Sequence, residues 1–151
     1  MSGKTKRCSA LVLLMFLCIP LARPEDAPPV IAFVPFNAAG VSQEEAELFS
    51  AMLAKEFEAG GGFSVVQSDD VYALIEMEQA VKIALELGAD FIVTGKLFAF
   101  GDSHGAFITM FGVNPAVAVV AARQEEGMDA LMATAPGLCA ELLDYVAAKS
   151  E

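Results

Sequence analysis

Apolar and polar residues alternate in blocks along this chain, and each block has the length and spacing of one secondary-structure element. A continuous apolar run at 30–34 predicts a strand that is buried on both faces. From Ser42 towards Ala59 the apolar residues recur at helical spacing, and Ser42 with Glu45 has the pattern of a capping box. Three glycines at 60–62 predict the end of this first helix.

The remaining chain predicts a short second strand, a second helical stretch, three longer strands and a final helix. The helical stretch begins at Ser68 or Asp69 and reaches Leu87, and its irregular apolar face leaves open two shorter helices instead of one. Pro136 lies inside the final helical pattern, so we expect it to kink or split that helix. The predicted ranges are 63–67 for the second strand, 91–100, 106–113 and 116–123 for the last three strands, and 128–149 for the final helix.

This order, β-α-β-α-β-β-β-α, predicts a single α/β domain over residues 30–149, with a mixed five-stranded sheet and helices packed on it. The turns at 101–105 and 114–115 are short, so the last three strands should form an antiparallel meander. The connection through the first helix should be a right-handed crossover.

The start of the chain has the pattern of a signal peptide. Three basic residues within the first seven precede an apolar run at 11–17, which ends shortly before Ala22. A membrane span needs about 20 apolar residues, so this run is too short for one. We therefore expect a signal peptide at 1–22, a polar linker at 23–29, and export from the cytoplasm.

Cys18 leaves a second processing route open. In a lipoprotein leader, the cysteine after the apolar run carries the lipid and becomes the new N-terminus. That route normally needs small residues before the cysteine, whereas Met15, Phe16 and Leu17 precede Cys18. We expect cleavage after Ala22 and a periplasmic protein, with a lipid anchor on Cys18 as the alternative.

Cys139 is the one cysteine that remains after cleavage at Ala22, which excludes a disulfide framework within the chain. It falls on the apolar side of the last predicted helix with Leu138, Leu142 and Val146. We expect a small buried side chain here rather than a reactive thiol.

Acidic residues dominate the charge of the chain, whose formal net charge is −11. All 20 acidic residues lie at or after Glu25, and six basic residues follow Ala22, so the processed chain would carry −14. Such a surface repels phosphate groups, which disfavours nucleic acids and anionic lipid headgroups as partners. The apolar fraction of 56% is too high for a disordered chain.

Two short motifs contain residue types that are used in phosphate binding or catalysis. The glycines at 60–62 follow a helix and precede a strand, the reverse of the order in a phosphate-binding loop. Asp102, Ser103 and His104 are the residue types of a hydrolase triad, but adjacent residues in a turn point away from one another. We interpret the glycines as a helix stop and the second motif as an exposed turn.

Two acidic pairs, Glu44-Glu45 and Asp69-Asp70, lie at predicted helix starts, where the helix dipole stabilises them. Neither pair has the spacing of a calcium loop, and no cysteine–histidine cluster for zinc is present in the sequence. We therefore expect no catalytic residue, no cofactor and no metal ligand, and we expect that the protein is not an enzyme.

Two strings of residues resemble a known envelope module. They are Val-Ile-Ala-Phe-Val-Pro-Phe-Asn at 30–37 and Leu-Gly-Ala-Asp-Phe-Ile-Val-Thr-Gly-Lys-Leu at 87–97. With the element order, they resemble the amino-terminal domain of TolB, and the modules of CsgG and of lipoprotein activators of penicillin-binding proteins are similar. The likeness spans about 30–148, without the pore-forming hairpins of CsgG or the propeller repeats of full TolB. It implies a free-standing copy of a module used for protein contacts in the envelope, with no catalytic residues.

Four phenylalanines cluster on the third and fourth predicted strands. Alternation puts Phe98 with Phe100 on one face of their strand, and Phe107 with Phe111 on one face of the next. Core packing is the first expectation for them. An exposed part of this cluster, or the edge of the short second strand, would be the best place for a partner to bind.

The sequence thus predicts an exported, non-catalytic protein-interaction module of the bacterial cell envelope, whose partner is another envelope protein. A small lipoprotein tethered through Cys18, with a structural or assembly role, is the alternative. A periplasmic enzyme or small-ligand binder is the third and weakest interpretation, because the chain has one histidine and no tryptophan.

Overall fold

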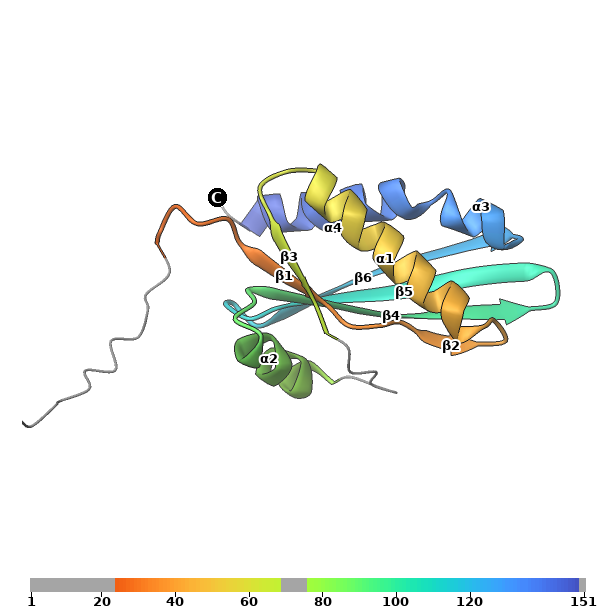
Figure 1. Cartoon of the computed structure of the whole chain (residues 1–151), viewed down its shortest axis with the longest axis horizontal. Helices are drawn as coiled ribbons and strands as arrows, with labels where there is room; N and C mark the ends of the chain where they lie inside the picture. Colours follow the sequence, from red (N-terminus) through yellow and green to blue (C-terminus); the bar gives the residue numbers. More distant parts are fainter. Residues whose placement is uncertain (1–23, 69–75, 150–151) are drawn as a thin grey trace, which may run out of the picture.

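The computed structural model describes residues 24–68 and 76–149, and within these ranges the chain forms one six-stranded sheet with helices on both faces (Figure 1). The element order repeats the predicted one, with one further short strand and with the final helix in two parts. In chain order the elements are β1 (Val30–Phe33), β2 (Asn37–Ala39), α1 (Gln43–Ala59), β3 (Ser64–Gln67), α2 (Met77–Glu86), β4 (Phe91–Phe100), β5 (Ser103–Gly112), β6 (Val117–Glu126), α3 (Met128–Met132) and α4 (Ala135–Lys149).

The sheet is mixed, as predicted, and its strand order is β3-β1-β4-β5-β6. β1, β3 and β4 are parallel, because helices lie in the connections between them. β4, β5 and β6 form the predicted antiparallel meander, joined by short turns. β1 therefore lies between two strands that come later in the chain.

β2 lies where the sequence predicted only the chain that ends the first strand. It pairs in parallel with β4, with Asn37 opposite Lys96 and Ala39 opposite Phe98. β5 occupies the other side of β4, so β2 continues the line of β1. Pro35 separates the two strands, since proline has no N–H to donate to a ladder. The predicted fold class is confirmed, with six strands in place of five.

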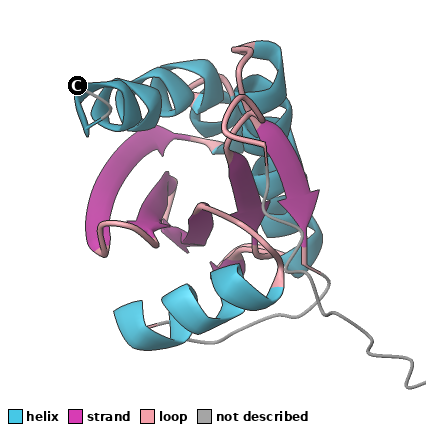
Figure 2. Ribbon diagram, turned by 90° about the vertical axis from the view of Figure 1, so that its left-hand side faces the viewer, coloured by secondary structure: helices cyan, strands magenta, loops and turns pink. Residues whose placement is uncertain are grey.

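Helices cover the two faces of the sheet unequally (Figure 2). α1, α3 and α4 lie over one face, and α2 lies over the other. The larger core lies under α1 and α4, where Phe33 and Phe57 are buried with ring centroids 5.4 Å apart, edge to face. The smaller core lies under α2 and includes Ile92 and Phe111.

The N-terminus of α1 has the predicted capping box. Ser42 Oγ accepts a hydrogen bond from Glu45 N–H at 3.1 Å, and Ser42 N–H donates to Glu45 Oε2 at 2.8 Å. The hydrogen bonds that the Glu45 carboxylate accepts from Ser42 hold the pKa of this carboxyl below its ordinary value, and the bond from the Ser42 backbone N–H has the larger effect. At the other end, Gly61 and Gly62 adopt positive φ angles of 73° and 85°, which glycine alone adopts without strain.

Two helices differ from their predicted ranges. α2 begins at Met77, whereas the sequence placed a helix start at Ser68 or Asp69. Ser68 instead follows β3 directly, and its N–H bonds the Phe33 carbonyl at 2.8 Å; Asp69 lies outside the described residues. The final helix is split into α3 and α4, as Pro136 predicts, because the proline takes a place in the first turn of α4 where no N–H is needed.

The helical segment 128–148 is long and apolar enough, by length and composition alone, to cross a membrane. In the structure it forms α3 and α4, and Leu131, Leu138 and Leu142 are completely buried in the larger core. Packing against the sheet and α1 therefore accounts for their apolar character.

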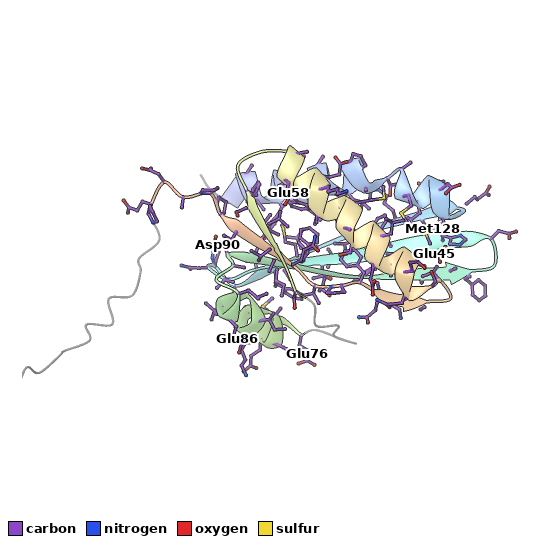
Figure 3. All side chains as sticks on the ribbon, viewed as in Figure 1. Glu45, Glu58, Glu76, Glu86, Asp90 and Met128 are labelled. Atoms are coloured by element: carbon purple, nitrogen blue, oxygen red, sulfur yellow. The ribbon has the colours of Figure 1, made fainter. Side chains whose placement is uncertain are left out.

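Asp90 joins the start of β1 to the start of β4 (Figure 3). Its side-chain Oδ2 accepts from Val30 N–H at 2.7 Å, and its own N–H donates to the Val30 carbonyl at 2.8 Å. The Asp90 carbonyl accepts from Val113 N–H at 2.9 Å, just beyond the end of β5. The Gly-Ala-Asp turn thus aligns three strands at one end of the sheet.

Candidate protein-interaction surface

α2 covers only one end of its face of the sheet. Its residues Ala80, Ile83 and Ala84 pack against Ile92 and Phe111. Among the described segments, no helix lies over the rest of this face, along the far part of β4 and β5 and along β6 (Figures 1 and 2). We call this region the uncovered face, and its side chains are those of Thr94, Lys96, Phe98, Phe107, Thr109, Ala118, Val120 and Ala122.

The register of the meander places these side chains on one face. Phe107 lies opposite Lys96 on β4 and opposite Ala122 on β6, while Thr109 lies opposite Val120. Directly opposed residues on antiparallel strands point to the same face. Phe107 is 47% exposed and Val120 is 50% exposed, so two large apolar side chains on adjacent strands face solvent together.

Phe98 extends this apolar surface towards the β4–β5 turn. It is half-buried because its ring lies over Gly105 on the neighbouring strand. A β-carbon at position 105 would lie 2.2 Å from Cζ of Phe98, so the ring fills the space that a side chain there would need.

Lys96 is the cation of the uncovered face. It is exposed and lies directly opposite Phe107, and within the described residues no carboxylate forms an ion pair with it. The two acidic ends of α2, Glu76 and Glu86, are exposed elsewhere (Figure 3). The surface around Phe107 is therefore apolar with one positive charge, on a chain whose formal net charge is −11.

The structure divides the predicted aromatic cluster between core and surface. The predicted alternation is confirmed, but only Phe111 is buried; Phe98 is half-buried, and Phe107 and Phe100 are exposed, Phe100 by 89%. The expectation of core packing was therefore wrong for Phe100 and Phe107. Sequence reasoning also missed Val120, because alternation along β6 separates two faces without showing which of them a helix covers.

The sheet has two edges, β3 and β6. The short strand β3 is an edge strand, and a depression of about 330 Å³ opens beside it at the C-terminal ends of β1 and β3. Its lining includes the buried side chains of Ser50 and Ser68, but it is open to solvent and does not enclose a ligand. β6 is longer, with ten residues.

Asp102, Ser103 and His104 do not form a catalytic arrangement. Ser103 already belongs to β5, so the turn is shorter than the predicted 101–105, and Ser103 Oγ accepts from Gln124 Nε2 at 2.6 Å. His104 Nδ1 lies 3.3 Å from the carbonyl oxygen of Asp102, not from its carboxylate. The nucleophile, base and acid of a triad are therefore not connected here.

Cys139 is a buried free cysteine in the core with Leu138 and Leu142, as predicted. Burial, and to a lesser extent the negative charge of Glu56, raises the pKa of its thiol to about 11. A thiol that stays protonated is a poor nucleophile and a poor metal ligand.

No three metal-ligating side chains come together within residues 24–68 and 76–149. Glu44 and Glu45 lie in the first turn of α1, where the sequence placed them as capping residues. Asp69 and Asp70, the second predicted pair, lie outside the described residues.

Comparison with known proteins adds a likeness of fold. No protein-family model matches the sequence, and no curated protein matches it significantly. Among solved structures, TolB from Acinetobacter baumannii is 16% identical with a TM-score of 0.55, and the match covers 79% of this chain but only 30% of TolB. A PelC dodecamer from Paraburkholderia phytofirmans is 18% identical with a TM-score of 0.51, over 78% of this chain and 86% of that one. The LpoB C-terminal domain from Salmonella enterica is 15% identical with a TM-score of 0.50, over 70% and 87%.

These matches confirm, at the level of fold, the resemblance to TolB and to lipoprotein modules of the envelope that the two strings indicated. They show a likeness of fold only. The candidate interaction surface of this chain is the uncovered face.

Proposed function

We propose that this protein is an exported, non-catalytic module of the bacterial cell envelope that binds another envelope protein through the uncovered face. The observation that carries the proposal is the pair Phe107 and Val120, half-exposed on a sheet face that α2 covers at one end only. The likeness of fold to TolB and LpoB supports the envelope as the place where it acts.

The chemistry of the uncovered face defines the partner surface that fits it. Apolar side chains of the partner would bury Phe98, Phe107 and Val120, and the removal of this apolar surface from water would favour binding. A carboxylate of the partner would pair with Lys96, which has no such partner within the described residues. Phosphate-bearing partners fit poorly with the acidic surface.

The test is capture from envelope fractions with a matched pair of variants. Phe107→Asp places a charge on the uncovered face, and Leu85→Asp places one on α2, where Leu85 is 63% exposed. We expect wild type and Leu85→Asp to recover the same envelope protein and Phe107→Asp to lose it. A photo-crosslinking residue at position 107 would identify the protein that touches the face. If wild type recovers no specific protein, or if Phe107→Asp recovers it as well as wild type does, the proposal is wrong.

Export and anchoring are tested separately by the intact mass of the native protein from an envelope fraction. Cleavage after Ala22 would leave the linker 23–29 and the domain 30–149 as a periplasmic protein. A mass that starts at Cys18 and includes acyl chains would instead establish the lipid anchor. In that case Cys18→Ser should release the protein from membranes.

A further inference from the structure

The hydrogen bonds of the meander fix which backbone groups of β6 point away from the sheet. Val113 N–H bonds the Asp90 carbonyl, so odd-numbered residues of β5 face β4 and even-numbered ones face β6. Gly127 N–H bonds the Asp102 carbonyl at 3.1 Å, so odd-numbered residues of β6 face β5. Because β6 is the edge strand, the N–H and C=O groups of Ala118, Val120, Ala122 and Gln124 point outwards.

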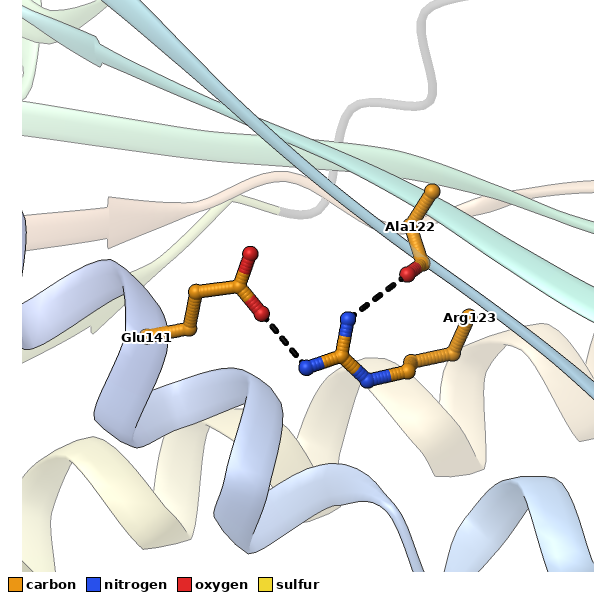
Figure 4. A network of polar contacts seen from close by, with 3 residues as sticks. All are labelled: Ala122, Arg123 and Glu141. Atoms are coloured by element: carbon orange, nitrogen blue, oxygen red, sulfur yellow. Dashed lines mark hydrogen bonds and ion pairs between the residues drawn. The ribbon is translucent and has the colours of Figure 1, made fainter.

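The second half of this edge is protected by a side chain. Arg123 Nη1 donates to the outward carbonyl of Ala122 at 2.8 Å, and Nη2 bonds Glu141 Oε2 of α4 at 2.5 Å (Figure 4). The guanidinium thus lies across the edge and satisfies an acceptor that a new strand would need. Glu125 and Glu126 add charge to the strand beyond it, a common way to prevent edge pairing.

Within residues 24–68 and 76–149, no side chain protects the first half of the edge in this way. The segment 117–121 has no charged residue, no proline and a high proportion of β-branched side chains, and Ala118 and Val120 are exposed. An uncharged, extended edge of this kind pairs readily with another strand. β6 therefore has one protected half and one half that is open to a strand.

We propose that the open half of β6 pairs with the same segment of a second copy of this chain, antiparallel, about a two-fold axis at Val119. In this register Ala118 lies opposite Val120 of the second copy, and Val120 opposite its Ala118. The outward N–H and C=O groups of Ala118 and Val120 in each copy then form hydrogen bonds between the two strands. A single sheet runs through the two molecules, and this is a self-complementary, closed interface.

The Arg123 contact favours this register over the one whose axis lies one residue later. A two-fold axis one residue later, at Val120, would oppose Ala118 to Ala122 of the second copy and compete with the guanidinium for the Ala122 carbonyl. With the axis at Val119, the hydrogen-bonded residues are Ala118 and Val120, so the Ala122 carbonyl is not needed. Val119 then lies opposite Val119 of the second copy, as a pair of β-branched side chains. The paired segments carry no charge, so no like charges face one another within them.

The test compares two prolines in the same strand, in the protein as its host cell processes it. Val120→Pro and Gln124→Pro each remove one outward N–H and no backbone hydrogen bond to β5, but only Val120 lies in the open half. Gln124→Pro also removes the side-chain hydrogen bond from Gln124 to Ser103 Oγ, which Gln124→Ala removes alone and so controls for. In sedimentation velocity we expect twice the monomer mass for wild type and Gln124→Pro, and the monomer mass for Val120→Pro. Added salt should strengthen the dimer, because it screens the repulsion between two acidic molecules.

Amide hydrogen exchange of wild type gives a readout that does not depend on how the proline variants fold. In concentrated samples the amides of Ala118 and Val120 should exchange slowly and that of Gln124 quickly, and all three should exchange quickly on dilution. A wild type that stays monomeric at high concentration and salt, or a Val120→Pro dimer, would overturn the proposal. So would a monomer whose Ala118 and Val120 amides are protected only by a strand of a different protein. Phe107→Asp should leave the dimer intact, which separates this proposal from the function proposed above.

Discussion

The ring of Phe98 on β4 lies over the backbone of Gly105 on β5, directly where a β-carbon of residue 105 would be. This contact requires a glycine at the third residue of the ten-residue strand β5, because the Phe98 ring occupies the space that a β-carbon there would need.

Gly105→Ala should lower stability by forcing that ring into solvent. We expect a cost of about 1–3 kcal/mol, typical of overpacking. In a Phe98→Ala background the same substitution should cost almost nothing, since the colliding ring is gone. Urea unfolding of the four proteins in this double-mutant cycle measures the coupling. If Gly105→Ala costs the same in both backgrounds, the Phe98 ring is not the reason why residue 105 must be glycine.

Gly95→Ala should cost more than Gly105→Ala. A β-carbon at 95 would lie 2.8 Å from Cε2 of the buried Phe36 and 2.9 Å from the backbone carbonyl oxygen of Phe107. Neither neighbour can move into solvent, whereas the Phe98 ring can. Thermal unfolding of the two single variants tests the order, and a smaller loss for Gly95→Ala would contradict it.

Two phenylalanines should respond very differently to truncation. Phe57 is completely buried between Phe33 and Phe63, so Phe57→Ala should cost about 3–5 kcal/mol. Phe107→Ala should change stability little, because the side chain is 47% exposed, although binding of a partner should fall. Chemical denaturation measures the first effect and the capture assay the second. A large loss of stability in Phe107→Ala would mean that the residue serves the fold.

The capping box should make stability depend on pH in the acidic range. The Ser42 hydrogen bonds lower the pKa of Glu45 in the folded chain, so its contribution is present above the ordinary value of 4.5 and is lost as the pH falls through the lowered value. Glu45→Gln should therefore be less stable than wild type at neutral pH, and the two should converge on acidification. Glu44→Gln, which leaves both Ser42 bonds in place, is the control. A difference that stays constant with pH would contradict the assignment.

The thiol of Cys139 should be inert in the folded protein. Burial raises its pKa to about 11 and blocks access, so a thiol reagent at neutral pH should label it slowly until the chain is unfolded. A cysteine at the exposed neighbouring position, Ala140→Cys in a Cys139→Ala background, should react at once. Equal labelling rates of the two folded proteins would show that the helix opens readily at this point.

Much of the fold could be predicted from local patterns. The capping box at Ser42, the glycine stop after α1 and the split near Pro136 each depend on residues close together in sequence, and the structure contains all three. The short turns between β4, β5 and β6 fixed their antiparallel order for the same reason. β2 was missed because three residues, Asn-Ala-Ala, have no strand pattern of their own and pair only because β4 extends beyond β1.

The interaction surface was less predictable. Strand alternation put Phe107 and Phe111 on one face, but α2 covers Phe111 and stops short of Phe107, and the reach of a helix across a sheet is set by tertiary packing. The protection of β6 by Arg123 depends on Glu141, eighteen residues further along, so no local pattern indicates it.

The central place of β1 has a consequence for the order in which the chain can fold. β1 is the first strand to be made, yet both of its neighbours, β3 and β4, are made later, and β4 ends only at Phe100. The central sheet therefore cannot close before about two thirds of the chain has left the ribosome. The central sheet of such a chain is incomplete for most of its synthesis. An unfolded polypeptide is the form that can pass through a narrow channel.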